Sequence, residues 1–82
     1  MKLSDRIREF VFQEFIKPAR ERGEGTVTIR AGDVHSMMGL SDRIPAVCSA
    51  LGTNKFQEMY QVRLIDRKGP TNASNVFFTF EV

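Results

Sequence analysis

Apolar residues recur along the first part of the chain with the period of a helix. A stripe of Leu3, Ile7, Phe10, Val11, Phe15 and Ile16 predicts a helix over residues 5–17, with Ser4 as its N-cap. Phe12 lies off this stripe, so we expect it to face a second element or a partner subunit. Pro18 is expected to break or restart the helix, because proline lacks a backbone N–H. The polar positions are expected to face water: Arg6, Arg8, Glu9, Gln13 and Glu14.

Three later segments alternate with a period of two and predict strands. Residues 26–30 (TVTIR) are β-branched at alternate positions. Residues 61–66 place Val62 and Leu64 on one side, and residues 76–82 place four apolar side chains on one face: Val76, Phe78, Phe80 and Val82. The connector over residues 67–75 has a loop-forming composition, so the last two strands form a hairpin with a long tip. The first strand is expected to join this hairpin as an edge strand.

Short helical segments fill the middle of the chain. One follows residues 31–33 and is stopped by Gly39. A central helix begins after the N-cap candidates Ser41 and Asp42, has Pro45 in its first turn, and ends near residue 51 with Gly52 as a left-handed stop. Its apolar face consists of Ile44, Val47, Cys48 and Leu51, and its exposed face of Arg43, Ala46, Ser49 and Ala50. Thr53 is expected to cap one further turn, residues 54–59, which buries Phe56 and Met59.

The totals place limits on the class of protein. An 82-residue chain with 41 % hydrophobic and 27 % charged residues is typical of a globular protein, and we expect one domain over residues 1–82. No apolar run reaches the ~18–20 residues of a membrane span. The first residues are polar where a signal peptide needs an apolar core, so the sequence predicts a cytoplasmic protein without a membrane partner.

Few residues suggest reaction chemistry. His35 is the single histidine and has no cysteine or histidine at ligand spacing, and Cys48, the single cysteine, lies on an apolar helix face, as a buried core thiol would. The sequence has no glycine-rich phosphate loop and no spacing that pairs carboxylates for acid–base work. We therefore expect no enzyme activity, no cofactor and no metal site.

The order helix, strand, helix, helix, strand, loop, strand resembles a winged helix-turn-helix domain over nearly the whole chain. The segment GDVHSMMGLSDRIPAVCSAL is also similar to stretches of small archaeal and bacterial winged-helix proteins. The resemblance implies an α+β fold of order α-β-α-α-β-β with a three-stranded antiparallel sheet. The helix-turn-helix would span about residues 32–51 and the wing about residues 67–75. It further implies that the recognition helix, residues 42–51, enters the major groove of double-stranded DNA while the wing contacts the backbone.

On this interpretation exposed residues of two segments, polar apart from one alanine, contact nucleic acid. The central helix and the turn after it supply Ser41, Arg43, Ala46, Ser49, Thr53, Asn54 and Lys55. The wing supplies Arg67, Lys68, Thr71 and Asn72. Hydroxyl, guanidinium and backbone N–H groups bind phosphates, and small residues let a helix approach base edges. Asp42 opposes this interpretation, because a carboxylate repels phosphate unless it only caps the helix.

Two functions of different classes remain open. The first is a DNA-binding domain, either a transcriptional regulator or the DNA-binding component of a larger assembly. The second is a winged-helix protein–protein interaction module that binds no nucleic acid, since a fold does not fix a function. A net charge of only +2, Asp42 and the off-stripe aromatics Phe12 and Phe77 favour the second. A homodimer is compatible with both.

Overall fold

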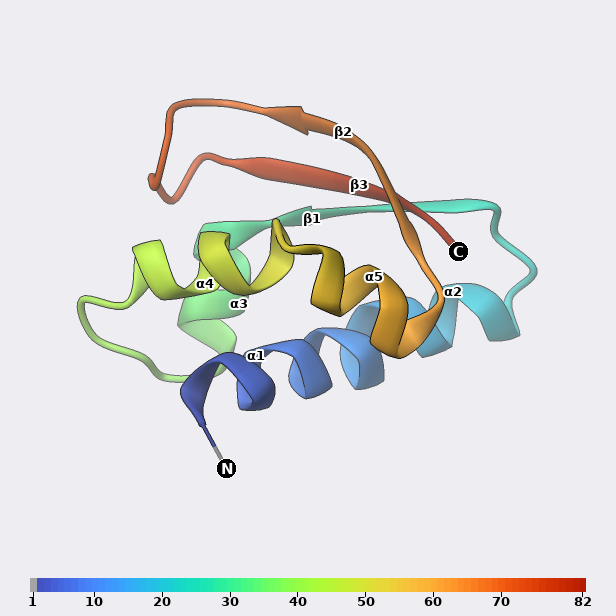
Figure 1. The fold of residues 1–82 in the computed structure, drawn as a ribbon, viewed down its shortest axis with the longest axis horizontal. Coiled ribbons are helices and arrows are strands. Elements are labelled where there is room, and N and C mark those ends of the chain that lie inside the picture. Colours follow the sequence, from blue (N-terminus) through green and yellow to red (C-terminus); the bar gives the residue numbers. More distant parts are fainter. Residues whose placement is uncertain (1) are drawn as a thin grey trace.

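Three strands form one antiparallel sheet, and the helices pack against one face of it (Figure 1). The computed structural model describes residues 2–82. The strands are β1 (Thr26–Arg30), β2 (Arg63–Lys68) and β3 (Phe77–Glu81), in the order β1-β3-β2. The helices between them are α3 (Ala31–Met37), α4 (Ile44–Leu51) and α5 (Asn54–Tyr60). The α+β class and the three-stranded antiparallel sheet with β1 at its edge are confirmed.

The N-terminal helix is longer than its sequence predicted. It runs through α1 (Leu3–Val11), a π-helical turn η1 (Phe12–Ile16) and α2 (Lys17–Glu21). Of the two expected alternatives, Pro18 does not break the helix but restarts it, in the first turn of α2. The Lys17 N–H donates to the Phe12 carbonyl, five residues back, and Pro18 lies in the first turn after this widened one. A wider turn makes room for the proline ring. It also moves Ile16 onto the same buried face as Ile7 and Val11.

The core lies between the helices and the inner face of the sheet. Phe56, Phe78 and Phe80 are its largest fully buried side chains, and the rings of Phe56 and Phe80 meet edge to face at 5.1 Å. Alternate residues of β3 are buried and exposed, as the sequence predicted. Phe77 is 40 % exposed on the outer face of the sheet. That outer face is left uncovered by the helices.

Two positions at the end of α5 differ from the pattern-based assignment. Met59 is 46 % exposed, so the prediction that it is buried is wrong. Tyr60 occupies the inner position instead and stacks on Phe12 with ring centroids 4.5 Å apart. Phe12 therefore faces a second element of the same chain, the first of the two expected alternatives. The helical period alone does not distinguish positions 59 and 60 at the end of a seven-residue helix.

Arg8 is the one buried charged residue among residues 2–82, although it was expected to face water. Its side chain lies where α1 crosses the end of α4. Nε donates to the Ala50 carbonyl at 3.2 Å, Nη1 to the Asp5 carboxylate at 3.0 Å and Nη2 to the Thr53 hydroxyl at 3.4 Å. Ala50 is buried by the same contact, which corrects its assignment to the exposed face of α4.

The turn that leads into α4 is built differently from the expected cap. Helix α4 begins at Ile44 rather than at residue 42, and no side chain caps it. Asp42 adopts φ 54°, and His35 Nε2 accepts a hydrogen bond from the Arg43 N–H at 3.2 Å, which ties the turn to α3. Gly52 has φ −87°, so it is not a left-handed stop; the chain continues directly into α5, which ends instead on left-handed Gln61.

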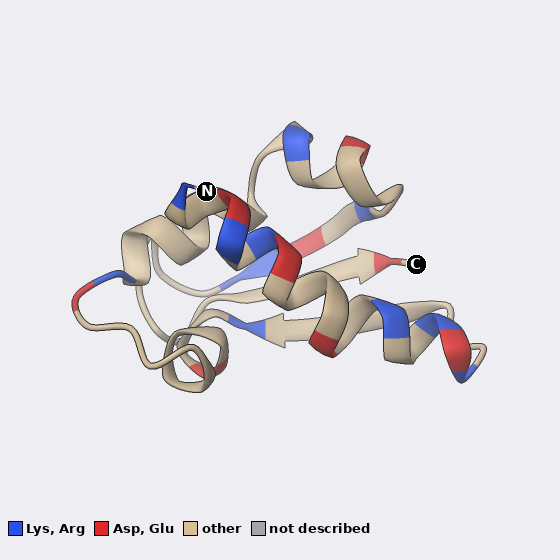
Figure 2. Ribbon diagram, turned by 90° about the horizontal axis from the view of Figure 1, so that it is seen from below, with Lys and Arg blue, Asp and Glu red and all other residues tan. Residues whose placement is uncertain are grey.

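None of the helices formed by residues 2–82 is long and apolar enough to cross a membrane. Lysines and arginines are interspersed with acidic residues along the helices (Figure 2). The longest helical stretch thus presents mixed charge rather than a basic face.

Candidate nucleic-acid interface

The last residues of the hairpin tip that follows β2, residues 73–75, are held against β1, α3 and α4. The Gly32 N–H donates to the Ser74 carbonyl at 2.9 Å, and the Arg30 guanidinium donates to the Asn75 side-chain oxygen at 2.9 Å. The Cys48 thiol approaches the Ala73 carbonyl at 3.9 Å. These contacts join the tip to the start of α3 and to α4. The tip therefore has a fixed position relative to the central helix.

Gly32 permits one of these contacts. A Cβ atom at this position would lie 2.7 Å from Arg30 Nη1 and 3.0 Å from both the Cβ and the carbonyl oxygen of Ser74. Any larger residue would push the tip away from α3. The need for glycine here follows from packing, because its φ is not in the left-handed region.

A polar hollow of about 230 Å³ lies between the C-terminal half of α4 and the hairpin tip. Its walls consist of Cys48, Ser49, Gly52, Thr53, Arg67, Thr71 and Asn72. Five of the eleven residues that the sequence predicted as nucleic-acid contacts thus line one cavity, although they come from segments about twenty residues apart. They bring hydroxyl, amide and guanidinium donors together.

Arg67 supplies the positive charge of this hollow. Its guanidinium carbon lies 5.2 Å from the centre of the Phe78 ring, a cation–π arrangement that restricts the side chain. No carboxylate of residues 2–82 forms an ion pair with Arg67, whereas Lys68 pairs with Asp66 at 3.7 Å and Arg63 with Glu81 at 3.4 Å. The charge at the hollow is therefore not neutralised by the protein.

Cys48 lies at the floor of the hollow and is almost fully buried, as the sequence predicted. Burial raises the pKa of its thiol, and the positive charge of Arg67 offsets this only in part. The thiol therefore stays protonated at neutral pH and does not bring a negative charge next to Arg67. A neutral floor leaves the hollow suited to an anion.

The remaining predicted contact residues lie outside the hollow. Ser41 and Arg43 are exposed in the turn before α4, and Ala46 is half-buried in its first turns. Lys55 forms an ion pair with Asp5 at 3.3 Å, and the Asn54 side chain accepts a hydrogen bond from Gln57. Lys68 is exposed on the outer side of the sheet. The structure therefore divides the predicted set into a cluster around Arg67 and a scattered remainder.

Thr53 has a second role that the sequence did not indicate. Its hydroxyl donates to the Ala50 carbonyl at 3.2 Å and accepts from Arg8, so it links the hollow to the buried arginine. No local sequence pattern shows this, because the two residues are 45 positions apart.

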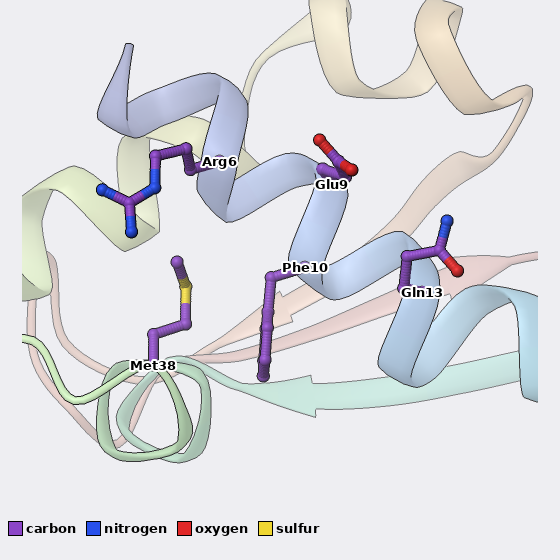
Figure 3. A pocket seen from close by; sticks show the side chains of 5 residues that line it. All are labelled: Arg6, Glu9, Phe10, Gln13 and Met38. Atoms are coloured by element: carbon purple, nitrogen blue, oxygen red, sulfur yellow. The ribbon is translucent and has the colours of Figure 1, made fainter. Parts of the chain in front are cut away.

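A second hollow, which the sequence did not predict as a site, lies between α1 and the end of α3 (Figure 3). It has a volume of about 530 Å³ and is lined by Arg6, Glu9, Phe10, Gln13 and Met38. In Figure 3 the Phe10 ring and the Met38 side chain extend toward the same space, with the Arg6 guanidinium above Met38. The available signal was the Met37–Met38 pair at a helix end, where only one of the two can be buried.

Comparisons of the chain with protein-family models, with curated proteins and with solved structures gave no match. The assignment of a function therefore rests on the geometry of the molecule itself.

Proposed function

We propose that this chain is a winged-helix domain that binds double-stranded DNA, with α4 as its recognition helix and the hairpin tip as its wing. The observation that carries the proposal is the polar hollow in which Ser49 of α4 meets Arg67, Thr71 and Asn72 of the hairpin. In this arrangement a DNA backbone that passes over the hollow would contact both elements.

The order of elements supports this interpretation. Helices α3 and α4 follow one another through a tight turn, and the hairpin of β2 and β3 projects beside α4, as in the winged-helix family that the sequence resembles. The hydrogen bond from the Arg43 N–H to His35 fixes the turn between the two helices.

The chemistry of the hollow fits a phosphate group. Phosphate oxygens accept hydrogen bonds, and the guanidinium of Arg67 offers several donors in a planar fork. The hydroxyls of Ser49 and Thr71 and the amide of Asn72 add further donors from two sides. Contacts of this kind position a protein on DNA, while base edges are read by groups that enter a groove. For that second task we propose Ala46 of α4 together with Ser41 and Arg43 of the turn before it.

The test is fluorescence anisotropy of a labelled, mixed-sequence DNA duplex titrated with the protein at low and at near-physiological salt. Arg67→Ala should weaken binding by about ten-fold or more, because the phosphate contact loses its charge. Arg63→Ala is the matched control, since it removes the same charge from the same hairpin where Glu81 already neutralises it. Equal affinities of the two variants would contradict the assignment of the hollow.

The alternative function, a protein–protein interaction module, has one observation of its own. Phe10 and Met38 supply apolar surface to the second hollow, and Met37, the residue before Met38 in the sequence, is 55 % exposed. Exposed apolar groups in a cluster mark interfaces. Phe12, which was expected to favour a protein–protein interface, does not support it, because its ring stacks on Tyr60 of the same chain. If the folded protein binds no duplex even at low salt, this alternative replaces the first, and a pull-down with the Phe10→Ser variant as control would follow.

A further inference from the structure

Strand β1 leaves one row of backbone groups without a partner. It lies at the edge of the sheet and pairs only with β3 (Figure 1). The Ala31 N–H donates to the Val76 carbonyl and the Val82 N–H to the Gly25 carbonyl. The backbone N–H and C=O groups of the odd-numbered residues of this segment therefore point toward β3. Because ladder bonds alternate along an antiparallel pair, the backbone groups of Thr26 and Thr28 and the N–H of Arg30 point toward the open edge, while the Arg30 carbonyl accepts the first hydrogen bond of α3.

This edge lacks the features that normally prevent strands from pairing. β1 contains no proline, glycine or bulge, and its one charged side chain, Arg30, already pairs with Asp33 at 2.9 Å. The opposite edge is different. β2 has a register shift between Leu64 and Asp66 and four charged residues among its six. Bulges and charges of this kind block edge pairing, so only β1 is open to an added strand.

We infer that β1 pairs with β1 of a second copy of this chain, in antiparallel orientation about a two-fold axis at Thr28. This register lets all five residues of the strand overlap. It places Thr28 opposite Thr28 and Thr26 opposite Arg30, and these are the residues whose backbone groups, apart from the Arg30 carbonyl, point outward. The result is a continuous six-stranded sheet in the order β2-β3-β1-β1-β3-β2.

The side chains agree with the same register on both faces of the sheet. Val27 lies opposite Ile29 of the second copy on the inner face, so apolar residues meet apolar residues. On the outer face the two Thr28 side chains meet, next to Thr79, whose hydroxyl already lies 2.9 Å from that of Thr28. No pair brings like charges together. TVTIR is thus complementary to itself in backbone pattern, apolar face and charge, and this is the reason for a second copy rather than a different partner.

Sedimentation equilibrium of the wild-type chain from about 10 µM to about 1 mM tests the inference, because an interface of one strand pair is expected to dissociate within this range. We expect a monomer–dimer equilibrium. Thr28→Pro removes an N–H that faces the second copy and leaves the bonds to β3 intact, so it should raise the dimer dissociation constant about ten-fold or more.

Two variants of opposite charge at Thr28 test the inference even if the proline variant fails to fold. Thr28→Lys and Thr28→Glu should each be monomeric, because like charges would face each other across the axis, and their equimolar mixture should dimerise again. Thr79→Lys is the matched control: it adds the same charge to the same face one strand away from the junction and should leave the dimer in place. A strictly monomeric wild type, or a dimer that all three Thr28 variants leave unchanged, would overturn the inference. Neither outcome depends on DNA binding.

Discussion

Arg8 shows how a single long side chain joins three parts of this small molecule. Its aliphatic stem is covered by the core, and its guanidinium reaches Ala50, Asp5 and Thr53. The last carbonyls of a helix have no partner within the helix, so a donor from α1 satisfies one of them at the end of α4. Because Arg8 is only 6 % exposed, water cannot easily replace it. The arginine therefore fixes the angle between α1 and α4.

Replacement of Arg8 by alanine should lower the free energy of unfolding by about 1–3 kcal/mol, because the Ala50 carbonyl loses one of its two donors, Asp5 loses an ion-pair partner and the stem leaves a gap. Urea unfolding followed by circular dichroism measures the effect. Arg6→Ala is the control, because Arg6 lies in the same helix on its exposed side. Its loss should change the free energy of unfolding by no more than about 0.5 kcal/mol. Equal stability of the two variants would show that Arg8 is dispensable.

At the scale of the elements, the anchored hairpin tip is the feature that brings the predicted contact residues together. Gly32 allows the tip to lie against α3, and Asn75 and Ser74 hold it there. β2 extends to Lys68, two residues into the segment predicted as the wing (67–75), so Arg67 is positioned by its pairing with Phe78 of β3. Thr71 and Asn72 lie in the connector itself, and the contacts of the tip hold them beside α4. Pre-organisation of this kind reduces the ordering cost of binding.

Gly32→Ala tests this arrangement directly. A methyl group at 2.7–3.0 Å from its neighbours must displace the tip, so we expect a loss of about 1–3 kcal/mol in stability and a weaker affinity for duplex DNA. Gly25→Ala is the control, because a Cβ there meets nothing within 4 Å and the backbone is not left-handed. If the Gly32→Ala protein had wild-type stability and affinity, the close contact at Gly32 would not be needed to position the hairpin tip.

The elements also show which features a sequence pattern can predict. The strand over residues 26–30 and the buried face of β3 were predicted correctly. β-branched and aromatic residues that alternate with a period of two favour a strand with one buried face over a helix. The burial of Arg8 and Ala50 was not predicted, and the continuation of the helix past Pro18 was left open, since each depends on a contact with a distant segment or on a π-turn. Five residues of the predicted contact set line the hollow between α4 and the tip, but no sequence pattern indicated the hollow itself. The second hollow at Phe10 was missed because Phe10 matches the pattern of a buried position.

At the scale of the whole molecule, one cluster of opposite charges connects the N-terminal helix to α5. Lys55 lies 3.3 Å from the Asp5 carboxylate, and Arg8 lies 3.0 Å from it on the other side. The hydrogen bond from Lys55 is the largest influence that lowers the pKa of Asp5 below its ordinary value, and the charges of Lys55 and Arg8 add to it. The ionised carboxylate is thus favoured in the folded state.

The sign of the pH dependence follows from this shift. Because the folded-state pKa of Asp5 is lower than the unfolded one, its contribution to stability is present above about pH 4 and is lost as the pH falls toward the folded value. Urea midpoints of the wild type and of Asp5→Asn, measured from about pH 6 to about pH 3, should therefore converge as the pH decreases. A difference that stays constant over this range would exclude the ion pairs as its cause.

The modest net charge of the molecule limits the strength of the DNA binding proposed for it. The formal charge is +2, and six of the twelve lysines and arginines already form ion pairs with carboxylates, so only part of the positive charge remains to neutralise phosphates. If one copy makes about four to six phosphate contacts, the slope of log K against log salt should be about −4 to −5, and Arg67→Ala should reduce its magnitude by about one. Anisotropy titrations at four or more salt concentrations measure both slopes, with Arg63→Ala as the variant whose slope should match the wild type. A slope near zero would mean that the hollow binds no phosphate, and the apolar surface at Phe10 and Met38 would then be the stronger basis for a function.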